Sequence, residues 1–397
     1  MSEVRVNNLS NENNTSGPTI SGITTYSGSH FFVPPQGDTA SRPSDCEPGS
    51  LRFNTDSAKL EYFRGNTIGW VEIDADNRSI TGTGNGTGSN ANSLGARGIS
   101  GGAHIYVRTI EFVTISTLGD SQDFGDLTVA AGYSRGQSAS NETRMLFAGG
   151  YGNPLKNNIE FITVQSQGNS TDFGDMTIGR IGMGAVSDKV RAVRGGGQNQ
   201  TGSPYYTNVI DYVEFSTTGN AVDFGDTVNA NGYRGGTCNS STRGIFCYSS
   251  YPSAPYCNFD TVITRTTGNA VDFAEGRGGY YSFEGGGGNG VRGIFAGSYI
   301  STLMDYFTIS HGGITQDFGD LVIRKYRNTT AASSTRWCSI GAQDYVPDPA
   351  GTVTRDEIEF VQIATTGDAV DFGDMSYLDG TGGTQQSNSN AHGGLSG

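Results

Sequence analysis

The chain has 397 residues, of which 61 are glycine, and it carries a formal net charge of −14. A negative charge of this size repels phosphate backbones, so the composition argues against nucleic-acid binding. No run approaches the length of a membrane-spanning helix, and the first residues lack the basic and apolar regions of a secretory signal. The high glycine content, with only 16% charged residues, predicts a turn-rich all-β protein.

Residues 1–80 lack the repeat that fills the rest of the chain, so we expect them to form a separate segment. Within it, 18–37 is a strand-like run that ends at Pro34-Pro35, and the alternating pattern of 49–73 predicts a β-hairpin. We expect Trp70 and Phe53 to cap a small core there. The glycine- and threonine-rich stretch 81–90 is expected to be a flexible linker.

Residues 91–397 contain six copies of one unit, each marked by the tetrapeptide Asp-Phe-Gly-Asp or a close variant. The copies lie at 123–126, 172–175, 223–226, 272–275, 317–320 and 371–374, with their first aspartates 45 to 54 residues apart. Spacing of this size is typical of β-propeller blades. Because each unit is predicted to contain four short strands, the repeats predict a six-bladed β-propeller.

Three further positions recur in every copy. An acidic residue lies twelve positions before each first aspartate, a glycine lies four positions before it, and an arginine opens an apolar run further upstream. The acids are Glu111, Glu160, Asp211, Asp260, Asp305 and Glu359; the glycines are Gly119, Gly168, Gly219, Gly268, Gly313 and Gly367; the arginines are Arg97, Arg144, Arg191, Arg243, Arg292 and Arg336. Two interpretations of the arginines stay open: each pairs with an aspartate of the tetrapeptide, or each is a solvated strand-end residue.

The tripeptide Asp-Phe-Gly also holds magnesium in protein kinases, but six copies argue for architecture rather than catalysis. We expect the phenylalanines to pack between blades, and the aspartates to accept backbone N–H groups at strand ends. A calcium site at Asn220, Asp223 and Asp226 is an alternative, although three oxygen side chains fall short of the ligands that calcium takes. We therefore expect no bound metal and no cofactor.

The C-terminal residues 387–397 resemble 91–102, with His392 where Arg97 stands. A seventh copy therefore begins there, and we expect 375–392 to add a strand to the sheet of residues 97–130 and close the first blade. The five cysteines lack the spacing of a metal site, so we expect them to be free. A disulfide between Cys238 and Cys247 is the alternative.

Length varies mainly in one connection per repeat, at 149–158, 195–209, 248–258 and 341–357. These segments combine tyrosine with serine, glycine and asparagine, the mixture that recognition loops use. The predicted binding face carries Tyr151, Tyr205, Tyr206, Tyr251, Tyr256 and Tyr345. The alternative is a set of solvated turns in which tyrosine only covers backbone. The four histidines fit no catalytic or metal motif, and we expect a protein that is not an enzyme.

Two parts of the sequence resemble known families. Residues 21–35 and 49–73 are similar to segments in structural proteins of tailed bacteriophages, notably those of cyanobacteria and other marine bacteria. The six repeats resemble kelch-type propellers, through double glycines and an aromatic position downstream. The double glycines are 101–102, 149–150 and 195–196, and the aromatic residues are Phe112, Phe161, Tyr212, Tyr306 and Phe360. The tetrapeptide phenylalanine stands where kelch repeats have tryptophan, so no kelch partner carries over.

The first resemblance implies a virion structural protein, assembled in the host cytoplasm and present in multiple copies. It also implies attachment to other virion proteins through the N-terminal segment, without membrane insertion. We interpret the chain as a tail-fibre or appendage protein whose propeller binds a glycan or protein of the host surface. A capsid or neck decoration protein is the alternative, and an envelope glycan hydrolase is less favoured.

Overall fold

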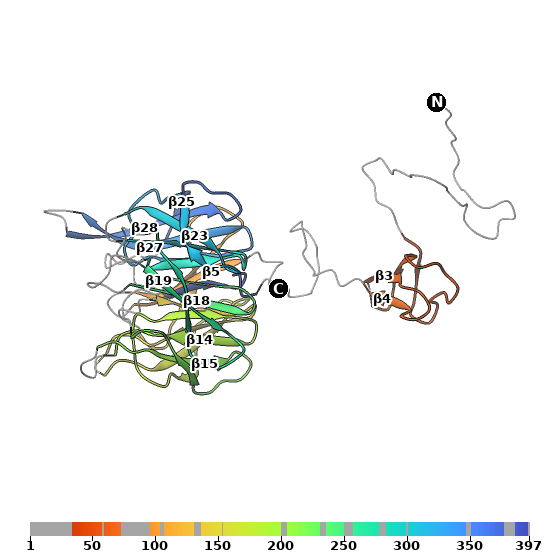
Figure 1. Ribbon diagram of the computed structural model, residues 1–397, viewed down its shortest axis with the longest axis horizontal. Helices are drawn as coiled ribbons and strands as arrows, with labels where there is room; N and C mark the ends of the chain where they lie inside the picture. Colours follow the sequence, from red (N-terminus) through yellow and green to blue (C-terminus); the bar gives the residue numbers. More distant parts are fainter. Residues whose placement is uncertain are drawn as a thin grey trace, which may run out of the picture. The chain divides into compact units, whose positions relative to one another are not determined.

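The computed structural model divides the chain into two compact units, Met1–Asn77 and Arg78–Gly397 (Figure 1). It describes residues 34–57, 59–72, 96–103, 107–130, 136–152, 154–199, 205–230, 236–249, 257–277, 283–298, 301–346, 351–376 and 386–395. These residues form strands and turns with no helix among them, which confirms the prediction of an all-β fold. Within the same ranges no helix is able to span a membrane. The predicted linker 81–90 and the run 18–33 lie outside the described residues.

The described part of the first unit is a small sheet in the order β1-β2-β3-β4. Its strands are β1 (Gln36–Gly37), β2 (Leu51–Asn54), β3 (Lys59–Phe63) and β4 (Trp70–Glu72). Phe53 pairs with Leu60, whereas Trp70 pairs with Phe63. Because successive residues of β3 point to opposite faces, Phe53 and Trp70 lie on opposite faces of the sheet. The core predicted from both is therefore wrong, and Trp70 packs on Phe63 with ring centroids 5.5 Å apart.

The described part of the second unit consists of six sheets of four or five strands, which we number in chain order. Sheet 1 contains β7 (Gln122–Asp126), β6 (Val107–Thr114), β5 (Arg97–Ala103), β30 (Gln386–Ser389) and β8 (Gly136–Gln137). Sheet 2 contains β9 (Ala139–Ser140), β10 (Arg144–Ala148), β11 (Asn158–Thr163) and β12 (Thr171–Asp175). Sheet 3 contains β13 (Gly184–Ser187), β14 (Arg191–Gly195), β15 (Val209–Glu214) and β16 (Val222–Asp226).

The remaining three sheets repeat this order with two departures. Sheet 4 contains β17 (Thr237–Asn239), β18 (Arg243–Ser249), β19 (Cys257–Ile263), β20 (Val271–Glu275) and the added β24 (Gly313–Ile314). Sheet 5 contains β21 (Gly285–Gly288), β22 (Arg292–Ala296), β23 (Leu303–Thr308) and β25 (Gln316–Asp320). Sheet 6 contains β26 (Thr329–Ala332), the long strands β27 (Arg336–Val346) and β28 (Gly351–Gln362), and β29 (Val370–Asp374).

The tetrapeptide strand of each sheet is hydrogen-bonded through its backbone to the next sheet. Gly168 N donates to Phe124 O at 2.8 Å, and Ser170 N donates to Asp126 O at 2.9 Å. The last sheet is bonded to the first in the same way, since Gly119 N donates to Phe372 O at 2.9 Å. Between sheets 4 and 5 Thr315 N donates to Glu275 O at 2.9 Å, and β20 also pairs in parallel with β24. The sheets therefore follow one another in a closed, β-propeller-like order.

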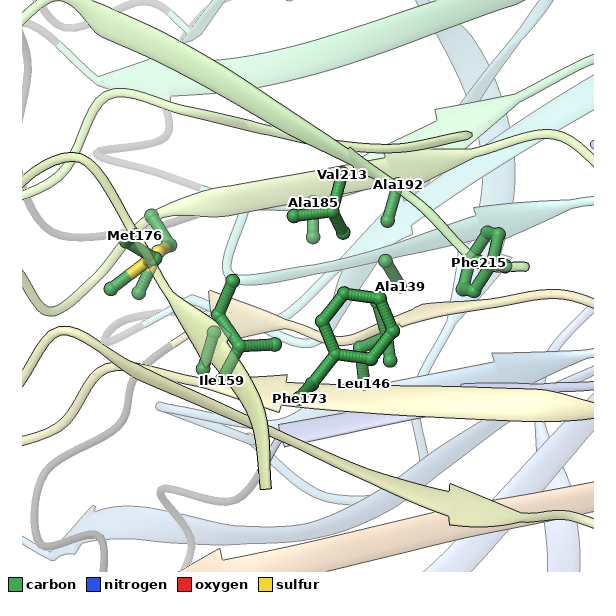
Figure 2. Close-up of a cluster of buried hydrophobic side chains, with 11 residues drawn as sticks. Ala139, Leu146, Ile159, Phe173, Met176, Ala185, Ala192, Val213 and Phe215 are labelled. Atoms are coloured by element: carbon green, nitrogen blue, oxygen red, sulfur yellow. The ribbon is translucent and has the colours of Figure 1, made fainter. Parts of the chain in front are cut away.

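The repeated phenylalanines lie between neighbouring sheets, as predicted. Phe173 packs against Leu146 and Ile159 of its own sheet and against Ala192 and Val213 of the next (Figure 2). Similar clusters contain Phe124, Phe224, Phe318 and Phe372. Burial of each such side chain contributes about 1.5–3 kcal/mol to folding. The hydrophobic core is thus divided among the interfaces between sheets.

The repeat arginines each begin a strand and stack on an aromatic ring. No described contact joins one of them to a tetrapeptide aspartate, so the first sequence interpretation is wrong. The second is correct about their place at a strand end, but they are half-buried rather than fully solvated. Arg97 Cζ lies 4.7 Å from the ring centroid of Phe112, and its Nη1 donates to Val164 O of the next sheet at 2.8 Å. The stacked pairs are Arg97–Phe112, Arg144–Phe161, Arg191–Tyr212, Arg243–Phe273, Arg292–Tyr306 and Arg336–Phe360. A planar guanidinium suits this combination of stacking and carbonyl binding. Most of these arginines therefore join two sheets.

The C-terminal residues contact the first strands of several sheets. Strand β30 pairs antiparallel with β5, with Gln386 opposite Gly101. Beyond it, His392 Nε2 lies 2.7 Å from Ser140 O, and His392 Nδ1 lies 3.0 Å from Asn239 Nδ2. Burial of the ring lowers the pKa of His392 to about 4. A neutral imidazole therefore joins sheets 2 and 4 to the end of the chain.

Candidate binding face

One end of the sheets carries both the connection whose length varies between repeats and the connection to the next sheet. In an antiparallel sheet of four strands, the link from the second to the third strand lies at the same end as the link to the next sheet. We call this end the loop end, and the described residues of the four predicted binding segments lie there. Figure 1 shows the β27–β28 hairpin extending beyond the other strands. The predicted loop 341–357 is therefore mostly strand, because β27 continues to Val346 and β28 begins at Gly351.

The buried repeat acids hold the connections at the loop end. Glu160 accepts hydrogen bonds from Thr128 N at 2.9 Å and from Val129 N at 2.8 Å, and both donors belong to the connection from the preceding sheet. The same contact is made by Asp211 with Thr177 N, by Asp260 with Val228 N and by Glu359 with Val322 N. The prediction that carboxylates bind backbone N–H groups at strand ends was thus correct in kind. It named the wrong carboxylates, because those of the tetrapeptide are largely exposed.

In three sheets a cation from the preceding connection also reaches the repeat acid. Arg180 Nη2 lies 2.5 Å from Asp211 Oδ1, and neither side chain is more than 1% exposed. Arg277 Nε lies 2.8 Å from Asp305 Oδ1, and Lys325 Nζ lies 3.5 Å from Glu359 Oε1. Burial lowers the pKa of Arg180, and the Asp211 carboxylate opposes that shift. Removing one partner of such a pair leaves an uncompensated buried charge, so these contacts fix the connections firmly.

Asp260 differs from these acids, since no cation pairs with it among the described residues. Its Oδ1 accepts a hydrogen bond from the Tyr248 hydroxyl at 3.0 Å, and its Oδ2 accepts one from Val228 N at 2.9 Å. Desolvation by burial raises the pKa of Asp260 to about 6, against the opposing effect of the Val228 hydrogen bond. A carboxyl group with such a pKa exchanges protons near neutral pH. Asp260 is fully buried, however, so no ligand can touch it in this arrangement.

The predicted tyrosines are placed unevenly. Tyr205 is 59% exposed and Tyr206 is 36% exposed, both before β15. Tyr151 follows β10 and is half-buried. The connection from sheet 2 to sheet 3 holds both the loop with Tyr151 and the loop with Tyr205 and Tyr206. Gly150 N donates to Arg180 O, and Gln198 N donates to Ile181 O. Tyr345 lies in β27, where the structure describes its backbone but not its side chain. Tyr251 and Tyr256 lie outside the described residues.

A polar cluster on sheet 6 escaped the sequence analysis. Arg355 Nη2 lies 2.9 Å from Asp344 Oδ2, and Arg324 Nη2 lies 3.5 Å from Asp344 Oδ1. Arg327 Nη1 donates to Gln343 Oε1 at 2.8 Å, and the φ of Arg327 is 59°. This is the one positive φ among the described residues other than glycine, and such strain often marks functional positions. The signal in the sequence was the basic run Arg324-Lys325-Tyr326-Arg327, which begins four positions after the repeat aspartate Asp320.

The remaining site predictions concern metals and cysteines. The described residues contain no group of three or more histidine, cysteine or acidic side chains arranged to hold a metal ion. In the proposed calcium turn, Asn220 Oδ1 already accepts a hydrogen bond from Asp175 N at 3.0 Å. Cys238 and Cys247 are both free and buried, so the alternative disulfide is not present.

Comparisons with known proteins add little to this geometry. No protein-family model matches the chain, and no curated protein matches it. One similar solved structure is titled "Structure of YjhT". It shares 12% sequence identity and a TM-score of 0.49, and the match covers 69% of this chain and 97% of that one. Similarity at this level carries no argument about activity, so function has to be inferred from the residues themselves.

Proposed function

We propose that the chain is a structural protein of a tailed-bacteriophage virion, of the tail-fibre or appendage type. In this proposal the second unit is a six-bladed kelch-like propeller, closed in the first blade by β30. The first unit contains a β-hairpin that attaches the protein to other virion proteins. The loop end of the propeller binds a glycan or protein of the host surface. The virion part of the proposal is supported by the resemblance of residues 21–35 and 49–73 to phage structural proteins.

One observation supports the binding role: buried ion pairs hold the connections at the loop end in place, while a tyrosine on a neighbouring loop stays exposed. Buried ion pairs such as Arg180–Asp211 hold the connections, while Tyr205 remains 59% exposed on the loop that these connections support. Recognition surfaces use this combination, because a rigid scaffold lowers the entropy cost of binding. Tyrosine suits a sugar ring or a protein surface, since it offers an apolar face and a hydrogen-bonding hydroxyl.

Replacement of both exposed tyrosines tests the binding role. In virions carrying Tyr205→Ala with Tyr206→Ala, we expect adsorption to host cells to fall about tenfold or more, because two aromatic anchors are lost. A matched control is Val291→Ala, which changes a side chain that is 65% exposed at the opposite end of the sheets. Unchanged adsorption by the tyrosine variant would contradict a role for this loop and favour the decoration protein.

The capsid or neck decoration protein is distinguished by copy number. A tail appendage is present in low tens of copies per particle and a decoration protein in hundreds, so quantitative mass spectrometry of purified virions separates them. The glycan hydrolase is supported only by the raised pKa of Asp260, and that side chain is fully buried. Release of reducing sugar from host envelope, lost on Asp260→Asn, would establish that activity.

A further inference from the structure

The chain continues beyond β30 at the end of the sheets opposite the loop end, since β30 runs toward the start of β5. Asn390 Oδ1 accepts a hydrogen bond from Arg97 N at 2.8 Å, so the chain is still held to β5 at this point. The residues that follow cross to the first strands of other sheets, and Gly393 N donates to Gly288 O of β21 at 2.9 Å. We call residues 391–395 the plug.

One side chain of the plug contacts the first strands of three more sheets. His392 Nε2 lies 2.7 Å from Ser140 O in sheet 2 and 3.2 Å from Ser187 Oγ in sheet 3. The other ring nitrogen, Nδ1, lies 3.0 Å from Asn239 Nδ2 in sheet 4. His392 is 3% exposed, so the imidazole is enclosed by these contacts and is the main polar anchor of the plug.

The hydrogen-bond partners determine which nitrogen of His392 carries the proton. Asn239 Nδ2 also donates to Ser187 O at 2.6 Å, which fixes the orientation of this amide and turns its NH2 group toward Nδ1. Gly394 N donates to Nδ1 as well, at 3.1 Å. Nδ1 is therefore an acceptor, and Nε2 is the nitrogen that donates to Ser140 O. A second proton, on Nδ1, would face two N–H donors.

One charged group acts on the imidazole from the described elements packed around it. This group is Asp188, directly after β13, and its carboxylate is already held by Val190 N, Arg191 N and Arg265 Nε. Desolvation opposes its ionisation, but the hydrogen bonds lower the pKa of Asp188, so it stays charged in mild acid. The other neighbouring strands contribute no titrating side chain at this point, since their residues are Ser140, Asn239 and Gly288.

We propose that the plug is released by acid, because protonation of His392 detaches residues 391–395 from the first strands while β30 stays paired with β5. The pairing of β30 and the hydrogen bond of Asn390 involve no titrating side chain, so they remain intact. Burial lowers the pKa of His392 to about 4, whereas a released ring regains its ordinary value of 6.5. The released state therefore gains population as the pH falls from 6.5 toward 4, by up to about 300-fold. This proposal stands independently of the virion role.

Hydrogen–deuterium exchange of the full-length protein, followed by mass spectrometry of its peptides, tests the release. Exchange rates are corrected for their intrinsic dependence on pH. We expect the opening equilibrium of the plug to rise about fiftyfold from pH 7 to pH 4.5, whereas the amides of β11 keep their protection. Plug protection that is equal at both pH values would overturn the proposal. Simultaneous loss of protection in the plug and in β11 would also overturn it, since it would indicate global unfolding.

Two variants separate titration of the ring from its packing. His392→Gln cannot titrate, so its plug opening should be independent of pH, whatever its level at pH 7. Asn239→Asp places a carboxylate opposite Nδ1, which pairs with the protonated ring, so this plug should stay attached at pH 4.5. The matched control is His311→Gln, which changes an exposed histidine bonded to Ser310 Oγ and should open like the wild type. Acid opening that persists in His392→Gln or Asn239→Asp, or that is lost in His311→Gln, would contradict the proposal.

Discussion

Gly174 of one sheet lies directly against Gly219 of the next. A Cβ built on Gly174 would stand 2.3 Å from Gly219 O, and the φ of Gly174 is 145°. Both the neighbour and the backbone conformation therefore require glycine, which explains why the third residue of the tetrapeptide is so uniform.

We predict that Gly174→Ala lowers the free energy of unfolding by about 2–4 kcal/mol, since the methyl group forces two sheets apart and the φ is unfavourable. Thermal and urea unfolding measure the change. Sheet 4 supplies the control, because it already has Ala274 at this position and uses β24 to reach the next sheet. We expect Ala274→Gly to change stability by about 1 kcal/mol or less. Equal melting of Gly174→Ala and wild type would refute the close-approach explanation.

A second prediction concerns the stacked arginines. Arg97→Lys keeps the charge but loses the planar group that stacks on Phe112 and reaches Val164 O, so we expect a loss of about 1–2 kcal/mol. Denaturant unfolding provides the measurement. Lys189→Ala breaks an exposed pair with Glu142 and should change stability by about 0.5 kcal/mol or less. If the two variants are equally stable, the arginines do not join the sheets.

A third prediction compares two acids at the same repeat position. Asp211→Asn leaves the buried Arg180 without a charged partner, and we expect a loss of about 3–5 kcal/mol. Asp260→Asn removes a carboxylate that has no cation partner in the described residues, so at neutral pH it should cost much less. Chemical unfolding of both variants at pH 7 decides the matter. A larger loss for Asp260→Asn would contradict the difference between their environments.

A fourth prediction concerns pH and His392. Its pKa is about 4 in the folded protein and ordinarily 6.5, so between these values the unfolded state binds a proton that the folded state does not. Stability from this residue is therefore complete above about pH 6.5 and is lost as pH falls toward 4, by up to about 3 kcal/mol. Asp260 acts in the opposite direction, since its raised pKa favours folding at lower pH.

The contribution of His392 is isolated by comparing melting temperatures of wild type and His392→Gln from pH 4 to 7. We expect the wild type to lose stability more steeply than the variant as the pH falls. Parallel curves would show that the imidazole is not buried in the neutral form at the end of the chain.

The repeat could be predicted from the sequence because its signals are local. The spacing of Phe124 and its equivalents, and the alternation around Ile110, depend only on residues within one unit. The role of Arg97 could not be predicted, because its carbonyl partner, Val164, lies 67 positions away in the next sheet. Arginine commonly pairs with carboxylates, so pairing with aspartates was expected. Stacking on an aromatic ring produces no pattern of opposite charges in the sequence from which it could be predicted.

The candidate binding face was predictable only in part. Loop-length variation indicated the position of Tyr205 and Tyr206, since tolerance to insertion is a property of exposed segments. The buried role of Glu160 was not predicted, because its donors at 128–129 follow the preceding tetrapeptide and carry no side-chain signal. The placement of Phe53 and Trp70 on opposite faces of the first unit's sheet was likewise not predicted, since both look like core residues in sequence.

The proposed role, a tail appendage that displays a propeller, can be tested by locating the protein on the particle. Antibodies against the second unit would be used for immunogold electron microscopy of purified virions of a phage whose genome carries this sequence. We expect gold at the tail or its appendages, with labelling competed away by soluble protein. Labelling spread over the capsid, or purified virions that contain no copies of the protein, would contradict it.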